Sequence, residues 1–489
     1  MRRKRAFLLA VVVATLAMGI GYLIISNFAE RTYSVPAKAD PDKPDIILIS
    51  IDTLRPDHLG CYGYRQPTSP TIDRLAGGGV RFENAISTTS WTLPAHAALF
   101  TGLYDSAHGL VDNGLRLAEN HVTLAEVLGQ AGYQTAGFFG GPYLHPAFGV
   151  GQGFETYESC MTKLPDDASE RLVRAQSSIP DSVSHADITG PRTLKKFKHW
   201  LAKADERPMF VFLHFWDVHY DYIPPKKYIE MFDPDYKGQL SSVNFMRNPA
   251  IHRFMAPRDL QHLLALYDGE IRFTDDILGQ ILAELERSGR GQEALIVVSS
   301  DHGEEFFEHG GKGHTRTLFD EVVKIPLIFC WPGHLREGAV VPDQVRLIDV
   351  MPTILASAAV ELETEVQGRD ISELLRGDSL PEQSALCELM VFEKMRALRT
   401  RRMKVIKPLG SPGQAYFDLR RDPNERRRIS SLTAPAKALL EELNELTRES
   451  LSLYARRTRG QSQEMQISEE MRQRLRSLGY IGDGKEEEE

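Results

Sequence analysis

Residues 45–52 read Asp-Ile-Ile-Leu-Ile-Ser-Ile-Asp, a nearly unbroken run of aliphatic side chains between two carboxylates. A run this short and this apolar is typical of a strand that is buried on both faces. Similar runs occur at 210–214, 295–299 and 326–329, and apolar residues recur at helical spacing over 259–287. Strands that alternate with amphipathic helices predict an α/β fold whose mostly parallel sheet is covered on both sides.

Polar residues follow three of these runs directly. Asp52 comes after the first run, His214 to His219 lie at the end of the second, and Asp301 and His302 follow the third. Because ligands of such sheets gather at the carboxyl ends of the strands, we expect these side chains to face one edge of the sheet. Each of them alone is more typical of a turn or a helix cap, so the interpretation as a site depends on their coincidence.

The composition bounds the class of protein. The 489 residues include 42% hydrophobic and 26% charged residues, which excludes a chain that is disordered throughout and a fibrous repeat. The net charge of -9 argues against duplex nucleic acid as a partner, since that needs a basic surface. The cysteines are too few and too scattered for a disulfide scaffold or a Cys-x-x-Cys metal site: Cys61, Cys160, Cys330 and Cys387.

Changes in composition divide the chain into five segments. Near residue 385 the sequence changes character, and short strands at 396–408 and 415–419 are followed by a helix at about 434–453. The predicted segments are a basic segment with a transmembrane anchor (1–26), a linker (27–44), a catalytic domain (45–384), a small C-terminal α+β subdomain (385–460) and a C-terminal helix with an acidic tail (461–489).

The N-terminal segment predicts a single transmembrane helix that acts as a signal anchor. Basic residues 2–5 precede an uncharged run at 6–25, which as a helix would extend ~30 Å, the thickness of the hydrocarbon core of a bilayer. The positive-inside rule then places the rest of the chain outside the cytoplasm. A cleaved signal peptide is the alternative, although its apolar region is usually only about 7–15 residues long. We therefore predict a single-pass protein of the cell membrane with an extracytoplasmic catalytic domain.

Residues 90–102 read Ser-Trp-Thr-Leu-Pro-Ala-His-Ala-Ala-Leu-Phe-Thr-Gly and suggest a nucleophile. Pro94 fits the first position of a helix, because proline has no amide proton to leave unpaired there. Thr92 would then lie just ahead of the helix, where free N–H groups favour phosphate or sulfate, and a bound metal could activate its hydroxyl. With the Thr92 oxygen, the residues at the sheet edge supply three oxygens and one nitrogen: Asp52, Asp301 and His302. This set suits Zn²⁺, Mn²⁺ or Ca²⁺ and does not choose among them.

Several motifs in combination resemble the sulfatase family of the alkaline phosphatase superfamily. In chain order they are residues 48–63 with Ile-Asp-Thr-Leu-Arg and Gly-Cys-Tyr-Gly, 92–102, 299–303 with Ser-Ser-Asp-His-Gly, 318–332 leading to Trp-Pro-Gly, and 416–424 with its Asp-Pro pair. The resemblance covers roughly residues 44–430. It implies a three-layer α/β/α sandwich with a small C-terminal subdomain.

The resemblance also assigns roles position by position. It makes Thr92 the nucleophile and the following residues metal ligands: Asp52, Asp301 and His302. Sulfatases oxidise a Cys or Ser at the nucleophile position to formylglycine, and a threonine cannot yield that aldehyde hydrate. The arginine of the family signature is His96 here, which would make one cationic partner of the nucleophile titratable near neutral pH. Thr53 replaces the second Asp of the usual sulfatase pair.

The metal site is also similar to that of phosphoethanolamine transferases and lipoteichoic acid synthases, which belong to the same superfamily and use an unmodified threonine. This likeness moves the interpretation from sulfate towards phosphorus esters. His219 matches a family histidine that contacts the anion, and His314 and Lys312 are two candidates for the leaving-group acid. His309 is interpreted as a loop residue, and His214 as a buried, hydrogen-bonded one.

We therefore expect a membrane-anchored hydrolase of sulfate or phosphate esters that uses one divalent ion, Zn, Mn or Ca, and Thr92 as the nucleophile. The substrate would be an anionic ester on a glycan, a lipid or a small molecule. One alternative is a transferase that moves a phospho-headgroup onto a lipid or glycan. The other is a catalytically inactive binding protein with the sulfatase fold, which the changes at positions 53, 92 and 96 favour.

Overall fold

The computed structural model describes residues 43–161, 187–429 and 433–458, which all belong to one compact unit, Asp40–Glu489. The predicted anchor at 6–25 and the tail at 461–489 lie outside the described residues, as does nearly all of the linker. Within the described ranges, no helix combines the length and the apolar character that crossing a membrane requires.

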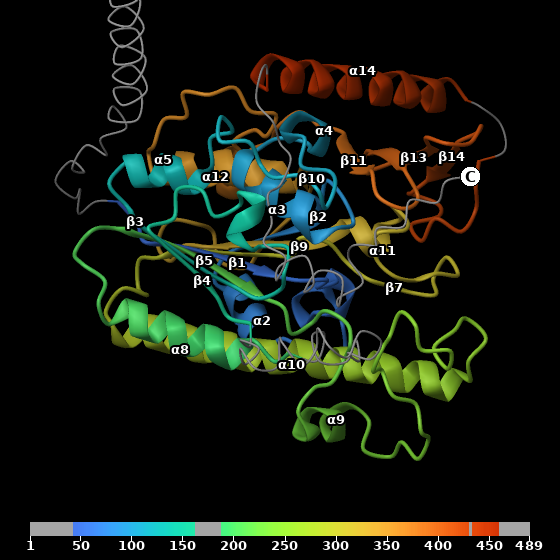
Figure 1. Cartoon of the computed structure of the whole chain (residues 1–489), viewed down its shortest axis with the longest axis horizontal. Helices are drawn as coiled ribbons and strands as arrows, with labels where there is room; N and C mark the ends of the chain where they lie inside the picture. The colour runs from blue at the N-terminus through green and yellow to red at the C-terminus, as the bar shows by residue number, and fades with distance from the viewer. Residues whose placement is uncertain (1–42, 162–186, 430–432, 459–489) are drawn as a thin grey trace, which may run out of the picture. The chain divides into compact units, whose positions relative to one another are not determined.

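The main sheet has eight strands among the described residues (Figure 1). In spatial order they are β10 (Ala339–Arg346), β2 (Val80–Ile86), β9 (Lys324–Cys330), β6 (Leu295–Ser299), β1 (Ile46–Ile51), β5 (Met209–Phe215), β3 (Gln134–Phe139) and β4 (Thr156–Ser159). Only β9 pairs antiparallel with its neighbours in this part of the chain. The mostly parallel sheet expected from the sequence is therefore confirmed, and the four apolar runs form β1, β5, β6 and β9.

Helices cover both faces of this sheet, as Figure 1 shows with α5 and α12 on one side and α8 and α10 on the other. One layer contains α3 (Thr92–Thr101), α5 (Leu124–Gln130) and α12 (Val350–Ser357); the other contains α2 (Pro70–Gly77), α8 (Gly190–Leu201) and α10 (Pro257–Arg287). Ile46 and Leu48 of β1 pack into the first core, whereas Ile47 and Ile49 pack into the second. Alternate side chains of one strand thus fill two cores, which gives the expected α/β/α layers.

The remaining elements of the main part are short. The α-helices are α4 (Asp105–His108), α9 (Lys226–Phe232), α11 (Asp320–Val323) and α13 (Ser372–Arg376). The 3₁₀ helices are η1 (Pro56–His58), η2 (Gly60–Tyr62), η3 (Pro146–Phe148) and η4 (Leu347–Asp349). A two-stranded sheet pairs β7 (Glu305–Phe306) with β8 (Lys312–Gly313).

A second, antiparallel sheet begins at Ala385, where the sequence changes character. Its order is β11 (Ala385–Leu389), β12 (Met395–Arg399), β13 (Met403–Pro408) and β14 (Ala415–Asp418), and α14 (Ala434–Arg457) packs against it through Leu439 and Leu443. The prediction of one strand over 396–408 is wrong, because Thr400 N–H donates to the Met403 carbonyl and turns the chain into a β12–β13 hairpin.

A buried carboxylate joins two helices of one layer. Asp275 of α10 accepts hydrogen bonds from the N–H groups of Thr71 and Ile72 in the first turn of α2. Burial nevertheless raises the pKa of Asp275 to about 6 from 3.8. Because the folded pKa lies above the unfolded one, protonation favours folding below about pH 4, and this stabilisation is lost as pH rises towards 6.

We therefore predict a pH-dependent effect of Asp275→Asn, which keeps an oxygen acceptor but cannot ionise. Between pH 4 and pH 6.5 the free energy of unfolding of the variant should rise by about 2 kcal/mol relative to wild type. Urea denaturation of both proteins at each pH measures this difference, in which the titration of other groups cancels. A difference that does not change with pH would contradict the assignment.

Candidate active site

Four predicted residues come from three elements that end or begin at one edge of the sheet. Asp52 follows β1, and Asp301 and His302 follow β6. Thr92 is the first residue of α3, whereas the sequence predicted that the helix would begin at Pro94. Proline fits the third position as well as the first, because none of the first four N–H groups of a helix has an intrahelical partner.

The donor atoms of these residues lie close together and are fully buried. Thr92 Oγ1 is 3.4 Å from Asp52 Oδ2 and 3.3 Å from His302 Nε2. His302 Nε2 is in turn 3.4 Å from Asp301 Oδ2 and 3.7 Å from Asp52 Oδ1. Ligands at about 2.1 Å from one tetrahedral ion are about 3.4 Å apart, so the spacing fits a single cation.

Backbone groups fix the orientation of two of these side chains. Asp301 Oδ1 accepts from the N–H groups of Thr53 and His302, at 3.3 and 2.9 Å, which leaves Oδ2 towards the cluster. His302 Nδ1 donates to the Gly303 carbonyl at 2.9 Å, so the lone pair is on Nε2. A side chain at position 303 would clash, because a Cβ there would lie 2.2 Å from the Glu321 carbonyl oxygen.

Thr53 supports the cluster from a strained backbone position. Its φ of 54° is in the left-handed region, which is rare for a β-branched residue. In addition to its N–H bond to Asp301, its hydroxyl donates to the Val218 carbonyl at 3.0 Å. Thr53 therefore positions Asp301 and directs its own oxygen away from the cluster.

Two oxygens of the cluster fit a bound cation. Asp52 Oδ1 and Asp301 Oδ2 are buried, and among the described residues neither has a hydrogen-bond partner. Burial, with the neighbouring Asp301, raises the pKa of Asp52 well above its usual range. Burial acts in the same direction on Asp301, but His302, His96 and His214 outweigh it and hold that pKa below its usual value. A cation that contacts both carboxylates would satisfy their oxygens and remove their mutual repulsion.

His96 does not have the properties expected of it. Its Nδ1 donates to the Thr92 carbonyl at 2.8 Å and its Nε2 lies 3.0 Å from the Ser50 hydroxyl, so both nitrogens are occupied. Burial, reinforced by His214, lowers the pKa of His96 to about 3. The prediction of a partner titratable near neutral pH is therefore wrong, because a fully buried imidazole stays neutral there. His96 fixes the backbone of Thr92.

His219 and His314 lie together beside His302. The His314 ring centroid is 4.5 Å from that of His302 and 4.9 Å from that of His219. His314 Nδ1 contacts Glu304 Oε1 at 2.9 Å, and the other oxygen of Glu304 accepts from the Tyr222 hydroxyl at 2.6 Å. Glu304 was missed at the sequence level, although its position two residues after His302 in Asp-His-Gly-Glu-Glu is a signal that could have identified it.

Lys312 is held elsewhere. Its ammonium group donates to the carbonyls of Phe245, Asn248 and Ile251, so its three N–H groups are taken up by one loop. The structure thus contradicts Lys312 as the leaving-group acid: its donors hold the 245–251 loop, and burial lowers its pKa. The same arrangement leaves His314 as the candidate acid.

The two histidines interpreted as structural are both held by neighbours. His309 stacks on Phe319 and contacts Glu321 and the Glu425 carbonyl. His214 is fully buried, with Nδ1 2.9 Å from the Gly140 carbonyl, as the sequence interpretation expected. Its Nε2, however, lies 3.5 Å from Asp52 Oδ2 at the metal cluster.

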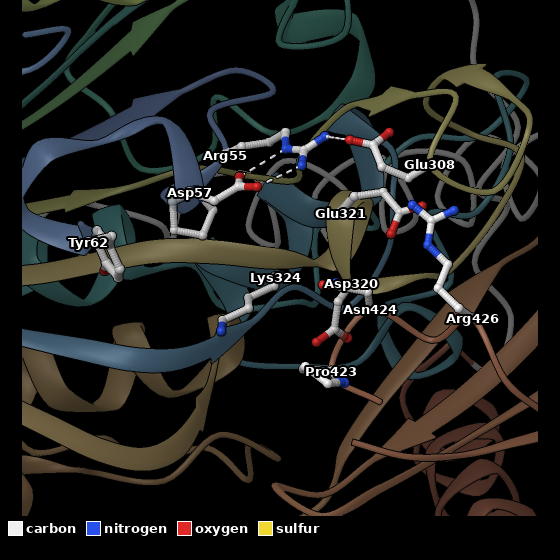
Figure 2. Close-up of a pocket in the computed structure, with 11 residues that line it drawn as sticks. Arg55, Asp57, Tyr62, Glu308, Asp320, Glu321, Lys324, Pro423, Asn424 and Arg426 are labelled. Carbon is white, nitrogen blue, oxygen red and sulfur yellow. Dashed lines mark hydrogen bonds and ion pairs between the residues drawn. The ribbon is translucent and has the colours of Figure 1, made fainter. Parts of the chain in front are cut away.

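A separate cavity of about 470 Å³ lies between η1, α11 and the loop after β14 (Figure 2). In Figure 2, Arg55 points towards Asp57 and Glu308, and the dashed lines mark its ion pairs with both. Asp320, on the opposite wall, pairs with Arg399 and Lys404. The described residues that line this cavity include none of the predicted site residues, and these carboxylates are already neutralised by neighbouring cations.

The profile of the sulfatase family matches residues 44–360, about two thirds of the chain. The chain belongs to the sulfatase family. A second profile, the C-terminal region of N-sulphoglucosamine sulphohydrolase, matches residues 308–450. The resemblance inferred from the motifs is thus confirmed, and so is the class of ester hydrolase at the level of the family.

Individual relatives are distant but cover most of the chain. The ulvan-active sulfatase of Formosa agariphila is 24% identical over an alignment of 443 positions that covers 85% of this chain and 82% of the relative. The structure of BT4656 with its substrate D-glucosamine-2-N,6-O-disulfate has a TM-score of 0.68 and 19% identity, over 84% of this chain and 98% of that one. The phosphonate monoester hydrolase of Agrobacterium radiobacter also has a TM-score of 0.68, with 23% identity over 84% and 96%. These two structures share the fold.

Proposed function

We propose that the protein is a metal-dependent hydrolase of sulfate or phosphate esters in which Thr92 is the nucleophile. The observation that carries the proposal is the position of Thr92 Oγ1 at the first residue of α3, 3.4 Å from Asp52 Oδ2 and 3.3 Å from His302 Nε2. A hydroxyl at this position lies beside the ligand atoms of a cation site and beside the free N–H groups at the start of a helix.

The residues that would hold one divalent ion are Asp52, Thr92, Asp301 and His302, which the sequence also predicted. When bound, the ion would lower the pKa of the Thr92 hydroxyl and offset charge on the ester oxygens. The donor set admits Zn²⁺, Mn²⁺ or Ca²⁺.

The protein groups would divide the reaction between them. Thr92 Oγ1, with its proton released to solvent, bonds to phosphorus or sulfur while the bond to the alcohol oxygen breaks, and His314 Nε2 gives that oxygen a proton. Water then attacks the Thr92 ester, returns a proton to His314 and releases the inorganic anion. Glu304, at 2.9 Å from His314 Nδ1, orients this imidazole. His219, in ring contact with His314, would contact the anion.

The nucleophile favours phosphorus esters within the proposed class. A formylglycine hydrate can expel sulfate by rearrangement to the aldehyde, whereas a threonine ester requires a second attack at the central atom. The relatives named above act on an ulvan, a disulfated glucosamine and a phosphonate monoester by their names. An anionic ester on a glycan, a lipid or a small molecule is the proposed substrate of this chain.

Substrate probes test the proposal directly. The metal-loaded protein is incubated with an aryl sulfate, a phosphomonoester, a phosphodiester and a phosphonate monoester, each with and without an acceptor alcohol. The expected result is release of the aryl alcohol without an acceptor, fastest for a phosphorus ester. Turnover only with an acceptor would show a transferase, and inactivity on every probe with metal bound would show a binding protein.

His314→Asn is predicted to separate substrates by their leaving groups. An acid is needed most when the leaving alcohol is a poor one, so kcat/KM should fall about 10²-fold for an alkyl ester and much less for a 4-nitrophenyl ester of the same acid. Steady-state kinetics on the matched pair of esters measures the loss of kcat/KM for each leaving group. An equal loss on both esters would remove His314 from the role of leaving-group acid.

We also propose that residues 6–25 anchor the catalytic domain outside the cytoplasm, on the basis of the basic residues before an apolar run of bilayer length. Alkaline carbonate extraction of membranes from cells that express the full chain tests this. Retention in the pellet is expected, and release of a shortened chain into the medium would show a cleaved signal.

A further inference from the structure

His214 presents a lone pair to the cluster. It lies in β5, paired with Ser50 of β1, and is therefore beside the end of the strand that supplies Asp52. Its Nδ1 is 2.9 Å from the Gly140 carbonyl, and because a carbonyl can only accept, the proton is on Nδ1. Its Nε2 is then an acceptor, and it has no hydrogen-bond partner among the described residues.

The atom that faces this lone pair is also an acceptor. Asp52 Oδ2 is 3.5 Å from His214 Nε2, and both residues are fully buried. The Thr92 hydroxyl donates to Asp52 Oδ2 at 3.4 Å, but His214 Nε2 has no hydrogen-bond donor among the described residues, and a buried acceptor that faces another acceptor is unfavourable. The distance is too long for a hydrogen bond, yet it falls in the range of about 3.0 to 3.6 Å that separates adjacent ligands of one five-coordinate ion with bonds of about 2.1 Å.

Two neighbours make the inference specific to His214. His96, the other buried imidazole in contact with it, uses Nδ1 for the Thr92 carbonyl and Nε2 for the Ser50 hydroxyl, so its ring has no free lone pair. Thr53 directs its hydroxyl to the Val218 carbonyl. The Thr53 side chain therefore supplies no ligand atom to the cluster, and His214 Nε2, on the adjacent strand, faces the cluster instead.

We propose that His214 Nε2 is a fifth protein ligand of the metal, beside Asp52, Asp301, His302 and Thr92. The proposal rests on the metal dependence in the proposed function. His214 belongs to a group of candidate ligands with His96 and Asp301, whose ligand atoms lie within 4.8 Å of one another, and Asp301 also belongs to the group with Asp52 and His302. Asp301 and the 3.5 Å contact with Asp52 Oδ2 thus link the His214 imidazole to the other ligands. A site with two imidazoles selects Zn²⁺ or another transition metal over Ca²⁺, which prefers oxygen ligands only. Of the three metals that fit the other ligands, a ligand at His214 thus favours Zn²⁺ or Mn²⁺ over Ca²⁺.

The test counts imidazoles and needs no turnover. The purified protein is stripped with a chelator and loaded with Zn²⁺, and X-ray absorption at the zinc edge gives the number of imidazole ligands. Wild type should show two and His214→Phe, which keeps a ring in the same space, should show one. Calorimetry with Zn²⁺ and with Ca²⁺ should show a loss of zinc affinity of at least about 10-fold in the variant and a smaller change for Ca²⁺.

A matched control is His121→Phe, a change of the same kind at a fully buried histidine that belongs to neither group of candidate metal ligands. It should leave the imidazole count and both affinities unchanged. One imidazole in the wild type, or an unchanged zinc affinity in His214→Phe, would overturn the proposal, and the wild-type count decides even if the variant does not fold. A protein that binds zinc through two imidazoles but is inactive would contradict the proposed hydrolase activity and support His214 as a ligand. An active protein whose zinc has only one imidazole ligand would support the hydrolase activity and contradict His214 as a ligand.

Discussion

Replacing Thr92 with alanine is expected to lower kcat by at least about 10³-fold on every ester that the wild type hydrolyses. The reason is that Thr92 Oγ1 is the atom that both Asp52 and His302 face, at 3.4 and 3.3 Å, so its removal takes away the bond-forming group. Stopped assays with saturating substrate measure kcat, and zinc calorimetry checks that the three other sequence-predicted ligands still bind the ion.

Thr92→Ser is the matched control for this variant. It keeps the hydroxyl and the first position of α3 and loses only a methyl group, so kcat should stay within about 10-fold of wild type. If Thr92→Ala turned over as fast as Thr92→Ser with metal bound in both, Thr92 would not be the nucleophile.

Replacing Asp301 with asparagine is expected to reduce the affinity for zinc by more than about 100-fold, and activity with it. Loss of a group that only supports a ligand typically costs 10–100-fold in affinity, and Asp301 is proposed as a ligand itself. Its Oδ2 lies 3.4 Å from His302 Nε2 while Oδ1 is held by backbone N–H groups. Asparagine removes the charge at the atom that faces the cluster.

The effect of Asp301→Asn should depend on the metal. In chelator the variant should melt at a lower temperature than wild type, because the neighbouring histidines stabilise the ionised form of Asp301 in the folded protein and hold its pKa below the usual value. With zinc, wild type should melt at a higher temperature and the variant should not respond. Asp268→Asn is the control, since Asp268 is an equally buried carboxylate that pairs with His58 instead. A full zinc response in Asp301→Asn would exclude Asp301 as a ligand.

The sequence predicted the strands that carry the site because these strands are buried on both faces. β1, β5 and β6 are buried along their whole length and are mainly apolar, and polar residues lie at or just after the end of each. The strand β2, Val-Arg-Phe-Glu-Asn-Ala-Ile, was not predicted, because it alternates exposed and buried side chains and contains charged residues. The edge strand β4 is short and only half-buried, and it was missed for the same reason.

Roles that depend on tertiary contacts were not accessible to sequence reasoning. The neutral state of His96, in α3, follows from its burial against Ser50 and His214, which lie in two strands of the sheet. The ammonium group of Lys312 donates its hydrogen bonds to three carbonyls of a loop about 60 residues earlier in the chain. In both cases the residue type suggested a charged group at the site. The hydrogen-bond partners and the burial seen in the structure give the residue a different role.

The most direct test of the central claim is chemical trapping of the enzyme during turnover. Metal-loaded protein is mixed with a phosphorus or sulfate ester that it hydrolyses, quenched in acid, digested and analysed by mass spectrometry of the peptide that contains Thr92. The predicted result is one phosphoryl or sulfuryl group on Thr92, absent from the Thr92→Ala protein. A modification on another residue, or efficient turnover through an unmodified Thr92 under conditions that stabilise such esters, would contradict the account.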